Sequence, residues 1–296
     1  MRGVHITMKA ITAPKKRPRR STIWFRFKKN RLALFGLVVI IVLVAMTIGV
    51  SVFGDYSNAI DLNPADRFQS PSAEHWFGTD HQGRDVFWRV LFGARVSLLL
   101  GVAIVFCIVV LGIIMGSIAG YFGGKVDSVI MRVVDIFLSI PAIILAIAIV
   151  AALGSSIFNL LIALTLANWP ATSRIMRASI MKEKGQEYVE AAHCAGASNF
   201  RIILTHMIPN SMAPMLVEAT LALGRSILGI ATMSFLGLGV SPPTPEWGYM
   251  ISEAMQSIRY FPFIVLIPGA FMALTVMAFN LTGDGLRDAL DPKLKN

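Results

Sequence analysis

The sequence is poor in charged residues and in cysteine. Only 15% of its 296 residues are charged, against about 25% in an average soluble protein. Hydrophobic residues make up 55% of the chain, in runs long enough to cross a bilayer. Its two cysteines, Cys107 and Cys194, cannot build a disulfide framework, and neither has the spacing of a metal ligand. The low charge and the long apolar runs exclude a soluble globular protein and indicate an integral membrane protein.

Catalytic motifs are also missing. The chain has no His-Glu-x-x-His, no Gly-x-Ser-x-Gly and no paired cysteine motif. Ser179 and Lys182 have the spacing of a serine–lysine pair but lie in a basic loop without a companion motif. The Gly-Gly-Lys at 123–125 lacks the Ser or Thr of a phosphate-binding loop, because Val126 follows it. We therefore expect a non-enzymatic protein with no catalytic residue, no metal site and no cofactor of its own.

Acidic residues are absent from the first 31 positions, which hold eleven of the 27 basic residues. A net charge of +10 would suit nucleic acid, but basic residues ahead of a long apolar run are retained in the cytoplasm. The run from Leu32 to Phe53 is too long for a signal peptide and lacks a cleavage site. We predict an uncleaved first span, a cytoplasmic N-terminus and no nucleic-acid partner.

Five more apolar stretches follow, near 97–121, 129–153, 157–171, 214–236 and 263–281. Six spans would place both termini in the cytoplasm. Pro141 is expected to kink the third span, where Arg132 and Asp135 have the spacing of an i,i+3 pair. Trp169 is expected to mark the membrane interface at the end of the fourth span, and Trp247 to anchor a rigid external loop.

Glycines recur at every fourth position of the second span, at 112, 116, 120 and 124. This spacing places all four on one face of a helix and allows a neighbouring helix to approach closely. The pattern therefore predicts a tight helix–helix contact rather than a ligand-binding loop.

A polar stretch from Glu187 to Pro209 separates the fourth and fifth spans. It begins with good helix formers, and Gly196 is expected to end that helix. A second helical segment is predicted from Ser198 to Met207, with Pro209 as its stop. Because charged residues are costly in lipid, this helix–turn–helix must face water and offers a docking helix to another protein.

This stretch resembles the coupling loop of ABC-type importer permeases, in which Glu-Ala-Ala precedes a glycine and an Ile-x-Leu-Pro end. His206 and Ile208 depart from that pattern, and the His-x-x-Pro-Asn ending at Asn210 is similar to the dipeptide, oligopeptide and nickel branch of the family. The resemblance implies that these residues couple the chain to ATPases: Glu187, Tyr188, Glu190, Ala191, Ala192, Gly196, Ala197 and Pro209.

A second stretch, from Phe77 to Asp85, resembles another signature of the same branch, Gly-Thr-Asp-x-x-Gly-Arg-Asp. Asp80, Arg84 and Asp85 are expected to form a tight charged turn under a surface that faces an external partner. The alternative is a loop that satisfies its own charges, in which exposed pairs would contribute only about 0–1 kcal/mol each. Both interpretations can hold together.

The resemblance implies an all-α polytopic membrane protein with six transmembrane helices and the type I ABC importer permease fold. Its expected parts are a basic cytoplasmic segment (1–31), a first span (32–54), an extracytoplasmic segment (55–95), a core permease domain (96–283) with a coupling loop (174–213), and a cytoplasmic tail (284–296). The implied partners are membrane lipid, a second homologous permease in a heterodimer, two cytoplasmic ATPase subunits that bind ATP and Mg²⁺, and an extracytoplasmic solute-binding protein. The location is the bacterial inner membrane.

A short peptide is the expected substrate, with nickel or a metal chelate as the alternative. A channel or secondary transporter is the alternative from a different class, and the coupling loop argues against it. Glu218 and Arg225 lie in the fifth span, about 10 Å apart along the helix axis. This spacing predicts no tight pair between them. Arg225 is expected either to pair with the partner permease or to face a wet path and meet a peptide carboxylate.

Overall fold

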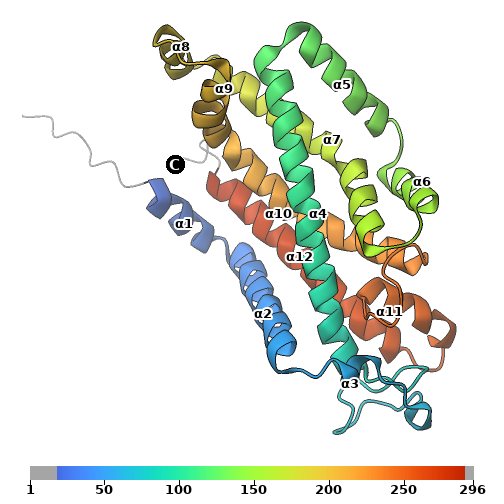
Figure 1. Cartoon of the computed structure of the whole chain (residues 1–296). Coiled ribbons are helices and arrows are strands. Elements are labelled where there is room, and N and C mark those ends of the chain that lie inside the picture. The colour runs from blue at the N-terminus through green and yellow to red at the C-terminus, as the bar shows by residue number, and fades with distance from the viewer. Residues whose placement is uncertain (1–18, 291–296) are drawn as a thin grey trace, which may run out of the picture.

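The computed structural model describes residues 19–290, and the remaining residues, including 15–18 of the basic run, lie outside this range. The described part is helical, with no strand, which confirms the all-α prediction (Figure 1). Its α-helices are α1 (Arg19–Lys29), α2 (Arg31–Phe53), α3 (Ser57–Ile60), α4 (Val86–Phe122), α5 (Gly124–Leu138), α6 (Ala142–Leu153), α7 (Ile157–Lys184), α8 (Glu187–Cys194), α9 (Asn199–Ile202), α10 (Ile208–Phe235), α11 (Trp247–Ala254) and α12 (Phe263–Leu290).

Four helical stretches of the described chain are long and apolar enough to cross a membrane: α2, α4, the run from α9 to α10, and α12. Helices α5 and α6 meet at 88° and form a fifth crossing if they count as one broken span. The 28-residue helix α7 lies among them (Figure 1). The predicted six spans are compatible with this arrangement.

Helices α4 and α7 pack closely through the predicted glycine face. A Cβ atom at Gly112 would lie 2.6 Å from Thr172, and one at Gly120 would lie 2.8 Å from the carbonyl oxygen of Arg177. Gly124 does not belong to this face, because it has a φ of +53° and begins α5 with open space around it. Three of the four glycines therefore serve the predicted helix–helix contact.

Gly116 offers a direct test of this packing. A Cβ atom there would lie 2.5 Å from the carbonyl oxygen of Ser173, so the Gly116→Ala variant must push α4 and α7 apart. We expect its free energy of unfolding in detergent to fall by about 1–3 kcal/mol. Gly49→Ala in α2 is the matched control, since nothing lies within 4 Å of the added atom. Equal stability of the two variants would contradict the close contact.

The bend predicted at Pro141 is present, but as a break between two helices: α5 ends at Leu138, Pro141 caps α6, and the two helices meet at 88°. Two other local predictions are wrong. Asp135 pairs with Arg174 of α7 rather than with Arg132. Trp169 is buried inside α7 and packs edge-on against Phe137. Helix α7 thus continues beyond Trp169, where the sequence predicts the membrane interface. Trp169 packs in the protein core and not among lipid headgroups.

Pro209 does not stop the second helix of the polar loop. It occupies the first turn of α10, where its missing N–H has no partner to lose. The chain approaches it through a π-helical turn, Ile203–Met207, which accommodates the proline within an unbroken helical path from Asn199 to Phe235. The polar loop is therefore joined directly to the fifth span.

Candidate functional site

Helix α8 is a short surface helix held by one buried side chain. Val189 is 2% exposed and packs in a cluster with Met176, Ile180, Ile202 and Met207 from the ends of neighbouring helices. The predicted contact residues Glu187, Glu190 and Ala191 are exposed, as is Tyr188, while Ala192 and Ala197 are half-buried. The helix thus presents an open face while its other side is fixed to the bundle.

The turn after α8 lies where the sequence predicts it. Gly196 has a φ of +78°, its N–H donates to the carbonyl of His193, and the N–H of Ala197 donates to the carbonyl of Ala192. This pair of bonds closes a helix through a left-handed residue. The chain reverses here, and α9 runs back toward the bundle.

Tyr188 ties α8 to two long helices. Its hydroxyl donates to the Glu183 carboxylate near the end of α7 and accepts a 3.3 Å hydrogen bond from Asn210 in α10. Burial, followed by the nearby Glu183 carboxylate, raises the pKa of Tyr188 to about 12, so the hydroxyl keeps its proton. At the other end of α8, the Tyr121 hydroxyl of α4 lies 3.3 Å from His193. Side-chain contacts therefore join α8 to α4, α7 and α10.

A cavity of about 300 Å³ lies between α4, α7 and α10, and we call it the ion-pair cavity. Arg225 and Glu218 line it and form an ion pair with each other, contrary to the prediction from their spacing. The long arginine side chain spans the two helical turns between them. The Arg225 side chain remains 56% exposed, whereas Glu218 is 12% exposed. The other lining residues are Ile108, Asn168, Ala171, Thr172, Ile175, Ala222 and Ser226.

A second cavity, of about 590 Å³, lies at the ends of α7 and α12 and the start of α10, and we call it the helix-end cavity. Its charged lining comprises Lys182, Glu183, Glu218 and Arg287. Glu218 and Ile175 line both cavities, so the two spaces adjoin at these side chains. The pair Glu183 and Asn210 places the helix-end cavity directly beside Tyr188 of α8.

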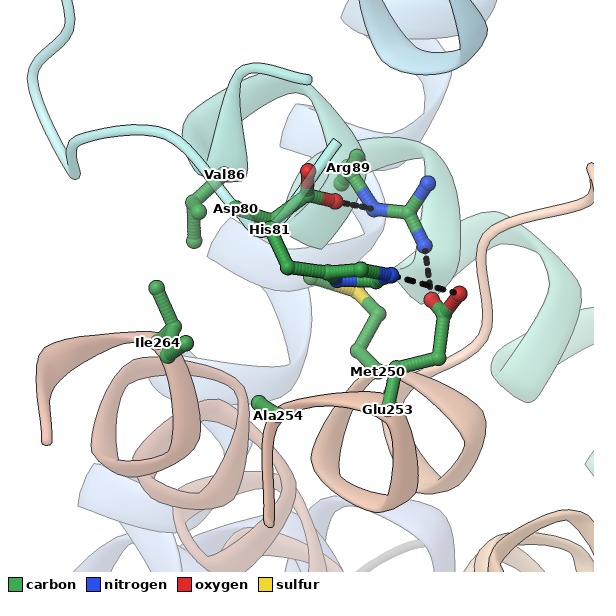
Figure 2. Close-up of a pocket in the computed structure, with 8 residues that line it drawn as sticks. All are labelled: Asp80, His81, Val86, Arg89, Met250, Glu253, Ala254 and Ile264. Carbon is green, nitrogen blue, oxygen red and sulfur yellow. Dashed lines mark hydrogen bonds and ion pairs between the residues drawn. The ribbon is translucent and has the colours of Figure 1, made fainter. Parts of the chain in front are cut away.

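At the opposite end of α4, two arginines and two carboxylates form a buried ring of ion pairs. Arg84 lies 2.7 Å from Asp80 and 2.9 Å from Glu253, and Arg89 lies 3.0 Å from Glu253 and 3.4 Å from Asp80. Figure 2 shows Arg89 between the two carboxylates, with His81 near Glu253. The ring joins the 55–85 segment to α4 and α11.

The structure turns Asp80 and Arg84 inward, so these residues lie beneath the outer surface. Arg84 is 3% exposed and Arg89 is 1% exposed. These ion pairs are therefore buried, unlike the exposed pairs of the alternative interpretation. Asp85 is separate: it caps α4 and lies 2.9 Å from His75. Sequence reasoning missed Arg89 and Glu253, and a contact across more than 160 residues leaves no local signal that could have revealed it.

Trp247 also lies inward, contrary to its predicted place in an external anchor. It is fully buried, and its indole N–H donates to the carbonyl of Val90 over 2.9 Å. Glu246, beside it, caps α11 and accepts a hydrogen bond from Ser97. These bonds fix α11, and with it Glu253, against α4.

Comparison with known proteins identifies the family of this chain. Residues 108–296 match the family described as binding-protein-dependent transport system inner membrane component. The chain belongs to this family. Residues 20–71 of the permease further match the N-terminal transmembrane domain of oligopeptide transport permease C, which confirms the resemblance to ABC importer permeases of the dipeptide and oligopeptide branch. The family assignment favours a permease over a channel or secondary transporter.

Individual relatives cover nearly the whole permease. It is 47% identical to the dipeptide transport system permease protein DppC of Alkalihalophilus pseudofirmus, over 92% of this chain and 89% of the relative. It is 39% identical to the oligopeptide transport system permease protein OppC of Bacillus subtilis, over 91% and 88%. It is 43% identical to the glutathione transport system permease protein GsiD of Escherichia coli, over 92% and 90%.

A solved structure of the MetNI methionine ABC transporter, in inward-facing conformations, shares the fold with a TM-score of 0.57 at 20% identity. The similarity covers 70% of this permease and 98% of that chain. The permease therefore has the ABC importer permease fold, and its apolar helices make it a multi-pass membrane protein.

Proposed function

We propose that this permease carries short peptides across the bacterial inner membrane as one half of an ATP-driven importer. The 47% identity to a dipeptide permease over almost the full chain carries this proposal. The oligopeptide and glutathione permeases among its relatives support the same class, because glutathione is itself a small peptide. No observation favours the alternative of nickel or a metal chelate.

The proposed complex contains a second homologous permease, two cytoplasmic ATPase subunits that bind ATP and Mg²⁺, and an external solute-binding protein. The exposed face of α8 suits an ATPase contact, because Val189 and Tyr188 link it to the helices that line both cavities. ATP binding would move α8, and α7 and α10 would follow it. The outer surface above Asp80, Arg84 and Asp85 is the proposed contact for the solute-binding protein.

Uptake by the complete transporter tests this function. The permease, coexpressed with the proposed partner subunits, is expected to import labelled dipeptides into proteoliposomes only with ATP and the binding protein. ATPase subunits with inactivated nucleotide sites are the control and should abolish uptake. Accumulation of nickel without any peptide uptake would replace the peptide proposal with the metal alternative.

We propose that the ion-pair cavity is part of the translocation path. Arg225 pairs within its own chain, so it does not require an acid from the partner permease. We expect Arg225→Ala to leave the heterodimer intact and to lower uptake of peptides with a free carboxylate about tenfold, the loss of one charged hydrogen bond. Arg174→Ala, outside this cavity, is the control. Loss of the heterodimer in Arg225→Ala would instead support an assembly role.

Both termini are proposed to lie in the cytoplasm, with α8 on the same side. In a background without Cys107 and Cys194, a cysteine at Ser241 should react with an impermeant thiol reagent from outside intact cells. A cysteine at Ser198 should react only after the cells are opened. The opposite labelling pattern would reverse the proposed orientation.

A further inference from the structure

Two of the four charged residues that line the helix-end cavity are cations, Lys182 and Arg287. Among the described residues, no ion pair joins Lys182 or Arg287 to an acidic side chain, although both line this cavity. The cavity's own acids are engaged elsewhere: Glu183 accepts the Tyr188 hydroxyl, and Glu218 pairs with Arg225. The lining therefore offers an anion two positive groups that are not already neutralised by a direct partner.

Glu218 connects the helix-end cavity to the ion-pair cavity, because its side chain lines both. Arg225 belongs only to the first cavity, and Lys182 and Arg287 only to the second. Glu218 therefore shares one cavity with Arg225 and the other with Lys182 and Arg287. A molecule with an ammonium group and a carboxylate would find a partner for each charge in both cavities.

We propose that the helix-end cavity is a second substrate station, in which Lys182 and Arg287 bind the carboxylate of a zwitterionic peptide while Glu218 holds its ammonium group. The peptide first replaces the Glu218–Arg225 pair in the ion-pair cavity. Its carboxylate then passes from Arg225 to Lys182 and Arg287, while its ammonium group stays with Glu218. This inference rests on the proposed peptide function.

The dimensions of the cavity suit this substrate. An extended dipeptide is about 7 Å long at 3.3–3.6 Å per residue, and 590 Å³ lies within the range of small-molecule sites, about 300–1,000 Å³. The station also lies at the α8 end of the permease, since Glu183 and Asn210 both line it and bond to Tyr188. A movement of α8 can therefore alter the station directly.

The test compares a Lys182→Gln, Arg287→Gln double variant with the unaltered permease, each in the complete transporter in proteoliposomes. We measure uptake of a dipeptide with a free carboxylate and of its C-terminal amide, and express each as the ratio of variant to wild type. This ratio cancels the selectivity of the binding protein. Lys125→Gln with Arg132→Gln is the charge-matched control, because both residues are exposed and line neither cavity.

The station predicts that uptake of the free dipeptide falls about tenfold in the double variant, that the amide ratio stays near one, and that Lys182→Arg with Arg287→Lys restores uptake. Equal uptake by variant and wild type, or an equal fall for acid and amide, would overturn the station. Failure of the ATPase subunits to copurify would also overturn it and assign these cations to assembly. If the wild type imports no dipeptide at all, it is the proposed function that fails.

Discussion

Gly196→Val is expected to lower both uptake and substrate-stimulated ATP hydrolysis while leaving the permease in the membrane. Gly196 has a φ of +78°, a conformation that costs a β-branched residue about 1–3 kcal/mol. Open space surrounds the position, so the added side chain meets no obstacle and only the backbone is affected. The turn must rearrange, and the exposed face of α8, the proposed ATPase contact, moves with it. We expect uptake and substrate-stimulated ATP hydrolysis to fall at least tenfold, since 1.4 kcal/mol already corresponds to tenfold.

Gly185→Val is the matched control for this experiment. Gly185 lies at the other end of α8, also with nothing within 4 Å of an added Cβ atom, but its φ is −85°. Valine is compatible with that sign of φ, so transport should stay near the wild-type rate. Full coupling in Gly196→Val would show that this loop is not where the ATPases act. Loss of membrane insertion would show a folding defect instead.

Arg89→Met is expected to cause the largest loss of stability in the protein. Arg89 is 1% exposed and lies between Asp80 and Glu253. Removing its charge leaves two buried carboxylates to share Arg84 alone, and an uncompensated buried charge costs about 3–5 kcal/mol. The free energy of unfolding, measured by denaturant titration in detergent, should fall by this amount. The 55–85 segment should become sensitive to protease, because the ring holds it to α4 and α11.

Arg174→Met provides the comparison, because Arg174 also pairs with an aspartate but the pair is about half exposed. An exposed pair contributes only about 0–1 kcal/mol, so this variant should remain close to wild type. If Arg89→Met is equally stable, water must reach the ring, and its role as a clamp would be wrong.

The 187–209 loop shows which features follow from local sequence. Glycine is the residue that accepts a left-handed backbone, so Gly196 marks the turn before any contact is known. The glycines of α4 repeat at helical spacing, and their packing against α7 follows from that period for three of the four positions. The sequence predicts a helix end at Pro209, but a proline stops a helix only where its missing N–H is needed. The π-turn before Pro209 removes that need.

The remaining features depend on which segments meet in space. The sequence by itself determined the membrane class, the helical content and the family, because apolar runs, turn residues and motifs are local properties of the chain. Tertiary structure alone decided that Trp169 and Trp247 are buried, that Arg89 and Glu253 complete the ring with Asp80 and Arg84, and that Glu218 lines two cavities. The sequence around a tryptophan does not distinguish a membrane interface from a protein core. The sequence around a charged residue likewise gives no sign of a partner far along the chain. Burial and pairing are set by the packing of whole helices, which no single stretch of sequence contains.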